Sequence, residues 1–361
     1  MDKPADTAPA DSFAHTVATA LFGNKAHDDV RSQIFELAAF RQNANDVEIG
    51  QTDQPAFDMP PELLAHHAVL FFQCDGKIAK KVAHLENEHG QPLITRDGVS
   101  LDGKEVHFVN IWNAKTQEYD LYEEILAERD PKTGFQGAAF FDHTRDRMTF
   151  NFGGTDFTNP RDMFISGGQM IGGKVDNRMT RAAPFTDQAM QTLHDRHPEL
   201  AETAPIDMAG HSTGPNAMAL AKYCLDAKWG RKVRSQHIVE PAGAINAYKL
   251  VSDMIAEAEK KSSAVTFSEL TQNAQTYKAK KGSFIGWFPK LSQNIGDIAL
   301  IDVKGGNDIA RHMGAAWING FMDEARQITV RAGAPKDTGP SKDMGRKDMG
   351  TVPQAIQKYG A

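Results

Sequence analysis

Hydrophobic positions follow strand-like and helix-like spacing in turn from residue 134 to residue 325. Short β-rich runs occur at 134–142, 148–156, 206–209, 237–243, 275–280 and 298–303, and apolar residues recur at helical spacing within 182–197, 216–228, 248–260 and 315–326. A polar turn separates the first two runs, which predicts a hairpin or two adjacent strands. Alternating strands and helices are typical of α/β proteins, so we expect a mostly parallel sheet.

The segments on either side of this region are more polar. An amphipathic helix is predicted at about 28–41, an apolar helix at 63–72 and a strand at 104–112. The chain is therefore predicted to divide into a flexible leader with one helix (1–60), an extension that packs on the core (61–133), the main α/β domain (134–331) and a disordered Gly/Pro/Lys/Asp-rich tail (332–361).

Composition limits the function without identifying it. The chain has 361 residues and a net charge of -7 at pH 7, whereas nucleic-acid-binding proteins usually present a basic face, so no nucleic-acid partner is expected. Its two cysteines, Cys74 and Cys224, are too few for a disulfide framework and indicate free thiols in a reducing compartment. The sequence shows neither a signal-peptide pattern nor an apolar run of the ~18 residues that a transmembrane helix needs. We expect a cytoplasmic protein, or one exported without a Sec signal peptide by a specialised secretion system.

One motif combines a strand, a sharp turn and a helix. The strand that ends near residue 209 runs into Gly210-His211-Ser212-Thr213-Gly214, and a helical pattern follows. In a nucleophile elbow the serine occupies a strained turn, and glycines two residues away on each side let the flanking chain pass closely. Ser212 is therefore predicted to be a catalytic nucleophile.

A second motif lies upstream, where the strand before the elbow ends in Phe152-Gly153-Gly154-Thr155. Together with the elbow it resembles the class 3 lipases of the α/β-hydrolase superfamily, including their bacterial lipase and phospholipase branches. In that family the upstream strand ends in Phe-Arg-Gly-Thr or Phe-Arg-Gly-Ser, and the elbow reads Gly-His-Ser-Leu-Gly-Gly. The resemblance covers about 134–320 and implies an α/β-hydrolase fold, a mostly parallel sheet with helices on both faces.

The same resemblance implies an oxyanion hole, in which Thr155 and Thr213 donate backbone N–H groups to the negative charge that forms on an ester carbonyl. Two positions depart from the family. Gly153 replaces the usual arginine, which removes an anchor beside the hole, and Thr213 replaces leucine, which makes the pocket more polar. No metal or organic cofactor is implied.

A serine nucleophile needs an imidazole that accepts its proton, and the hydrolase order places that histidine after the serine. Two histidines qualify, His237 and His312. His237 is predicted at the beginning of a strand, away from the carboxyl ends where such sites form. His312 is predicted in the loop after the last strand, so we expect it to be the base.

The third member of the triad is less clearly indicated, because relatives carry an aspartate where this chain has Gly282 and Ser283. Glu240 ends the strand that follows the elbow and is the preferred acid. Three further carboxylates near the last strand are alternatives: Asp302, Asp297 and Asp308. Ser283 or water could also replace the acid.

A glycine-rich segment between the two motifs, 157–181, is predicted to form a lid with an adaptable apolar face that includes Met179. Within it, Gly168 to Lys174 matches the spacing of a phosphate-binding loop, but Val175 stands where Ser or Thr is required, so a nucleotide site is not expected. The histidine pairs at 66–67 and 84–89 do not match zinc-binding spacing and are interpreted as structural or surface residues.

These observations predict a serine carboxylic-ester hydrolase, in particular a lipase or phospholipase that acts on lipid at a membrane surface. If the protein is an exported bacterial effector, an immunity or secretion partner is expected. Two alternatives are a soluble esterase for small substrates and a catalytically inactive hydrolase fold that serves as an interaction module.

Overall fold

The computed structural model describes most of the region in which the sequence predicts regular structure. The described residues are 25–44, 66, 85–87, 89–101, 104–113, 115–155, 175–259, 267–283, 293–304, 307–308, 317 and 321. Among them, no helix combines the length and apolarity needed to cross a bilayer.

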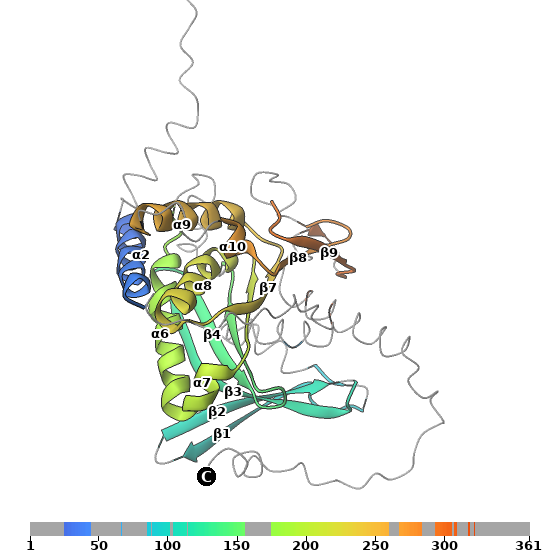
Figure 1. Cartoon of the computed structure of the whole chain (residues 1–361). Coiled ribbons are helices and arrows are strands. Elements are labelled where there is room, and N and C mark those ends of the chain that lie inside the picture. Colours follow the sequence, from blue (N-terminus) through green and yellow to red (C-terminus); the bar gives the residue numbers. More distant parts are fainter. Residues whose placement is uncertain are drawn as a thin grey trace, which may run out of the picture.

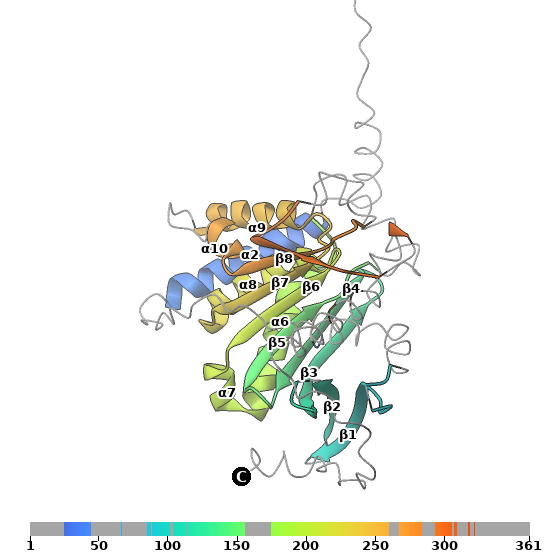
Figure 2. The same ribbon diagram turned by 90° about the vertical axis from the view of Figure 1, so that its right-hand side faces the viewer.

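A nine-stranded sheet forms the centre of the molecule (Figures 1 and 2). Its strands lie side by side in the order in which they occur along the chain. They are β1 (Ile94–Leu101), β2 (Lys104–Asn113), β3 (Glu118–Asp130), β4 (Phe135–Asp142), β5 (Arg147–Phe152), β6 (Ile206–His211), β7 (Val233–Val239), β8 (Ala274–Ala279) and β9 (Asp297–Ile301). Pairing is antiparallel from β1 to β5 and parallel from β5 to β9. The sheet is therefore mixed rather than mostly parallel.

Short turns explain the antiparallel half. The β3–β4 turn contains Gly134 at φ 75°, a backbone conformation that glycine adopts without steric cost. In the β4–β5 turn the Asp142 carboxylate accepts hydrogen bonds from the backbone N–H groups of Thr144 and Arg145, at 3.0 and 3.2 Å. The hairpin predicted at 134–156 is thus confirmed.

In the part of the chain that the structure describes, the helices that join β5 to β6, β6 to β7 and β7 to β8 lie on one face of the sheet (Figure 1). The β5–β6 connection contains α6 (Met179–Arg196) and the short α7 (Pro198–Thr203), whereas β6–β7 and β7–β8 are joined by α8 (Pro215–Trp229) and by α9 (Ala244–Glu259) with the short α10 (Phe267–Thr271). Right-handed crossovers that advance in one direction place their helices on the same face. The predicted helix near the N-terminus is α2 (Lys25–Ala44), which packs outside α6, α8 and α9.

The two faces of the sheet are distinguished by alternating side chains. On β4, Phe135, Ala139 and Phe141 belong to the core under the helices, whereas Ala138 and Phe140 belong to a second core on the other face. Trp317 and Phe321, both in helical conformation, pack into this second core. Helical residues therefore cover both faces, as an α/β fold requires.

Strands β1 and β3 were not predicted. β3 carries many charged residues, and its register shifts between Glu124 and Leu126. This irregularity interrupts the alternation of buried and exposed side chains by which a strand is recognised in a sequence. Both strands belong to the same sheet as β4.

Candidate active site

The backbone turns sharply between β6 and α8. Ser212 directly follows β6 and adopts φ 56°, in the left-handed region that non-glycine residues rarely occupy. Its N–H donates to the carbonyl of Val239 at 2.9 Å, and the Gly214 N–H donates to the carbonyl of His211 at 2.8 Å. Helix α8 then begins at Pro215, where the missing N–H of proline costs no helical hydrogen bond. This strand–turn–helix geometry is the one that the sequence motif predicted for residues 210–214.

Three glycines around Ser212 are required by close packing. A Cβ at Gly214 would lie 2.1 Å from the carbonyl oxygen of Phe152, and one at Gly210 would lie 2.8 Å from the sulfur of Met218. A Cβ at Gly154 would lie 2.8 Å from the Cβ of Ser212 itself. The end of β5 therefore packs directly on the elbow, which explains why both sequence motifs carry glycine.

The residues predicted to form the oxyanion hole contact one another. The hydroxyl groups of Thr155 and Thr213 are 3.1 Å apart. This contact brings the segment after β5 beside the residue that follows Ser212. The two threonines therefore lie on adjoining segments, which is the arrangement that an oxyanion hole built from both of them would need.

Sequence reasoning missed Arg178, whose guanidinium donates a hydrogen bond to the Thr213 hydroxyl. The side chain is 1% exposed, and its Nη1 lies 3.5 Å from Asp176 Oδ2. Asp176 in turn accepts a hydrogen bond from Asn216 Nδ2 at 3.0 Å. An arginine is therefore present beside the predicted hole, although it comes from the segment before α6 rather than from position 153. A comparison of motifs does not find this arginine, because Arg178 lies outside both motifs in the sequence.

Glu240 follows β7 and adopts φ 45°, so two adjacent parallel strands each end in a left-handed residue. Its buried carboxylate accepts hydrogen bonds from the Ala279 N–H at 2.7 Å and from the Ser283 hydroxyl. Burial raises the pKa of Glu240, although these two hydrogen bonds and the charge of Lys278 oppose the shift. The Glu240 carboxylate is thus hydrogen-bonded to Ser283, at the position where the sequence comparison with class 3 lipases leads us to expect an aspartate.

The alternative carboxylates lie in different surroundings. Asp302 is exposed after β9, and Asp297 is exposed at the beginning of β9. Because β9 is parallel to β8, its first residue lies at the amino ends of the parallel strands. Asp297 is therefore at the opposite end of these strands from the elbow. Asp308 is half-buried.

The predicted base, His312, lies outside the described residues. His237 lies within β7 rather than at its beginning, and its ring nitrogens contact the Tyr277 hydroxyl at 3.0 Å and the Ser235 hydroxyl at 2.9 Å. Burial lowers the pKa of His237 to about 4, which favours a neutral imidazole. His237 is therefore part of the buried polar contacts of the sheet.

Most of the predicted lid, including Gly168 to Lys174, also lies outside the described residues. The last part of the predicted segment does not form a lid. Met179 begins α6 and is fully buried in the core under the helices, and Val175 is also buried there. Helix α6 therefore begins within the segment that was predicted as a lid, and Arg181 interrupts the apolar periodicity of its first turn.

Chemically, the site offers a serine in an elbow, two threonines beside it and a buried carboxylate after the next strand.

No protein-family model matches the sequence, and no curated protein matches it. Solved structures give distant similarities. "ESTFA (FE-lacking apo form)" is 12% identical with a TM-score of 0.25, and covers 83% of this chain and 96% of its own. A hyperthermophilic esterase from the archaeon Pyrobaculum calidifontis is 12% identical with a TM-score of 0.27, and covers 82% and 96%. An esterase/lipase from an uncultured bacterium is 12% identical with a TM-score of 0.26, and covers 84% and 99%.

Proposed function

We propose that this protein is a serine-dependent carboxylic-ester hydrolase. The observation that carries the proposal is the backbone at Ser212, a non-glycine residue at φ 56° between a buried strand and a helix. Such strain costs about 1–3 kcal/mol and persists where surrounding packing enforces it, often at functional sites. Here the enforcing contacts come from Gly154, Gly210 and Gly214.

In the proposed reaction, the Ser212 hydroxyl attacks the ester carbonyl carbon as its proton passes to His312. The backbone N–H groups of Thr155 and Thr213 stabilise the oxyanion. The carbon–oxygen bond to the leaving group then breaks, and His312 gives its proton to the departing oxygen, which leaves as the alcohol. A water molecule attacks the acyl-serine as its proton passes to His312; the bond to Ser212 then breaks, His312 returns the proton to the Ser212 oxygen, and the carboxylic acid is released. Glu240 stabilises the transient imidazolium.

The proposed substrates are acyl esters of lipids, including phospholipids, because the paired motifs resemble those of class 3 lipases. A soluble esterase for short-chain esters is the second candidate. Release of fatty acid from mixed phospholipid vesicles, compared with hydrolysis of a short-chain ester, separates the two. A rise in rate when the substrate forms aggregates supports a lipase, and equal rates on both sides of that transition support the esterase.

Covalent labelling tests the hydrolase proposal directly. A fluorophosphonate probe should label the full chain at Ser212, as mapped by mass spectrometry, and Ser212→Ala should abolish both labelling and ester hydrolysis. Ser268→Ala, which changes an exposed serine on α10, serves as the matched control. A folded wild-type protein that neither reacts with the probe nor hydrolyses any ester would identify an inactive hydrolase fold instead.

A further inference from the structure

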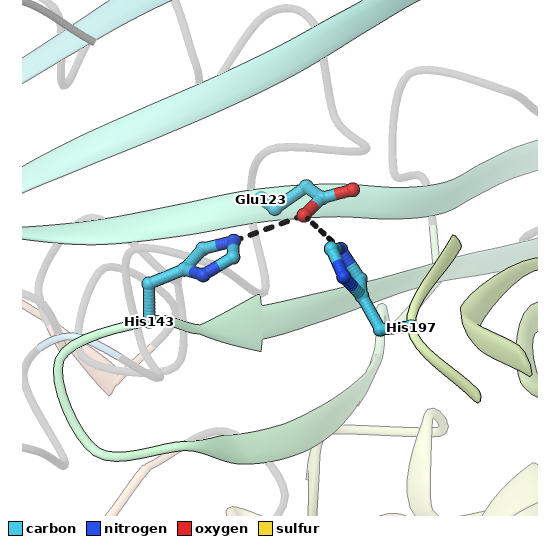
Figure 3. A group of neighbouring side chains, drawn as sticks. All are labelled: Glu123, His143 and His197. Atoms are coloured by element: carbon cyan, nitrogen blue, oxygen red, sulfur yellow. Dashed lines mark hydrogen bonds and ion pairs between the residues drawn. The ribbon is translucent and has the colours of Figure 1, made fainter. Parts of the chain in front are cut away.

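Two histidines and a glutamate from separate segments converge far from the elbow (Figure 3). Glu123 lies on β3, His143 directly follows β4, and His197 lies between α6 and α7. The Nε2 atom of each imidazole is 2.9 Å from the same carboxylate oxygen, Glu123 Oε2. All three potential ligand atoms lie within 4.8 Å of one another. The cluster thus brings two imidazole nitrogens and one carboxylate oxygen close enough together to be ligands of one ion.

The rings are fixed by aromatic packing. Phe141 lies edge-on to His143 with ring centroids 4.9 Å apart, and it stacks on His197 at 5.9 Å. Phe108 contacts the other side of His143, at 6.1 Å. The Glu123 side chain is 3% exposed and that of His197 is 16% exposed, so the cluster is nearly buried but has one side close to solvent.

The second carboxylate oxygen of Glu123 has a different partner. Arg196 Nη1 donates to Glu123 Oε1 at 2.8 Å and also lies 3.3 Å from the Glu124 carbonyl. Arg196 therefore orients the carboxylate while Oε2 remains directed between the two imidazoles. Outer hydrogen bonds of this kind commonly orient ligands at metal sites.

We propose that Glu123, His143 and His197 bind one Zn²⁺ ion. Two imidazole nitrogens and one carboxylate oxygen are a ligand set that Zn²⁺ accepts, with water in the fourth position. Bond lengths of about 2.0–2.2 Å place tetrahedral ligand atoms about 3.3–3.5 Å apart, so the two 2.9 Å contacts would widen by about half an ångström. Side-chain rotation about fixed backbones can supply such a change.

The position of the cluster indicates a stabilising role. His143 precedes β5 and Thr155 follows it, and a six-residue strand is about 20 Å long, so the ion would lie far from Ser212. It would join β3, the β4–β5 hairpin and the α6–α7 junction. The proposal is independent of the hydrolase activity, and its failure would leave that activity in place.

Metal binding is tested on the full chain after treatment with a chelator and dialysis. Isothermal titration with ZnCl₂ should show one site per chain with a Kd of about 1 µM or lower, and bound zinc should be confirmed by elemental analysis. Zn²⁺ at 100 times its Kd should raise the Tm by about 3–5 °C. His197→Ala should weaken binding at least 100-fold.

His194→Ala is the matched control, because this histidine lies in the last turn of α6 just before His197, is half-exposed and is outside the cluster. Glu123→Gln is a second test that keeps the side-chain volume and retains one oxygen to accept the imidazole N–H groups, yet should also weaken binding. Far-ultraviolet circular dichroism reports folding of each variant. The proposal is overturned if the wild type shows no saturable site, or if folded His197→Ala binds Zn²⁺ as tightly as the wild type. In either case the cluster is a buried carboxylate neutralised by its neighbours.

Discussion

The hydroxyl of Ser283 donates a hydrogen bond to the carboxylate of Glu240, which joins the end of β7 to the segment after β8. Class 3 lipases, which the two sequence motifs resemble, carry their acid after the strand that corresponds to β8. Here a glutamate from the neighbouring strand extends its carboxylate to that position, and a serine replaces the aspartate there. The acid that the sequence lacked at 282–283 is supplied by Glu240 in our proposal.

Ser283→Ala should therefore shift the pH dependence of ester hydrolysis. Burial already raises the pKa of Glu240, and removal of the Ser283 hydrogen bond should raise it further. Because the ionised carboxylate is the active form, the acid limb of kcat/KM should move to higher pH, with a smaller loss of rate above that limb. Initial rates between pH 5 and 9 measure this shift, with Ser268→Ala as control. A pH profile equal to that of the wild type would remove Glu240 from the triad.

Arg178→Met should lower kcat about 10- to 100-fold with little change in KM, because the guanidinium positions Thr213, the residue next to the nucleophile. Thr213→Val should have a similar effect. The double variant should be no worse than the more impaired single variant, since both changes break one chain of contacts. Steady-state kinetics on a short-chain ester measure these effects.

Arg181→Ala is the control for Arg178, since it removes a nearby arginine, in the first turn of α6, that pairs with Glu128 at 2.7 Å. It should leave kcat within about twofold of the wild type, as surface ion pairs contribute little. Equal losses in both arginine variants would mean that Arg178 acts only on folding.

Gly214→Ala should destabilise the protein by at least about 3 kcal/mol, because its Cβ would lie 2.1 Å from the Phe152 carbonyl oxygen and the backbone on both sides is buried. Urea unfolding followed by circular dichroism measures the loss. Gly98→Ala is the control, since its Cβ would lie 3.2 Å from the end of the flexible Glu105 side chain. A stable, active Gly214→Ala protein would contradict the observed contact between β5 and the elbow.

Stability should fall in mild acid because of buried histidines. The pKa of His237 is lowered to about 4 by burial, against an ordinary value of 6.5, and burial lowers that of His66 equally. Between pH 6.5 and 4 the unfolded chain binds protons that the folded chain does not, so the free energy of unfolding decreases as pH falls through this window. Each histidine accounts for about 3 kcal/mol of this change.

His237→Gln isolates one of these contributions. Glutamine keeps polar atoms near the hydroxyls of Ser235 and Tyr277 but does not titrate, so the slope of stability against pH should become shallower between pH 6.5 and 4. Urea unfolding at several pH values measures the slope. His194→Ala, which changes a half-exposed histidine, should leave it unaltered.

Local patterns predicted the parts of this structure that depend on neighbours in the chain. The elbow at Ser212, the hairpin at 134–156 and the helices α2, α6, α8 and α9 all have sequence signals within a few residues. β3 was missed because Glu123 and Glu124 occupy a strand interior, and the charge of Glu123 is compensated by a residue distant in sequence, Arg196.

Contacts between distant segments account for what the sequence did not indicate at the site. Arg178 reaches Thr213 across 35 positions, and Ser283 reaches Glu240 across 43. No periodicity connects such pairs. The mixed character of the sheet was also missed, since the antiparallel β1–β3 segment lies in the polar region that was expected only to pack on the core.

The agreement between strand order and chain order has a consequence for synthesis on the ribosome. When each strand from β2 onward is synthesised, the strand with which it pairs has already been synthesised. The sheet can therefore grow by adding one strand at a time at the same edge as the nascent chain emerges. The elbow forms part of this sequence of events, because the Ser212 N–H bonds to Val239 at the end of β7. A chain that has emerged only as far as α8 therefore lacks the contact that holds its nucleophile, and the site becomes complete only after most of the protein has been translated.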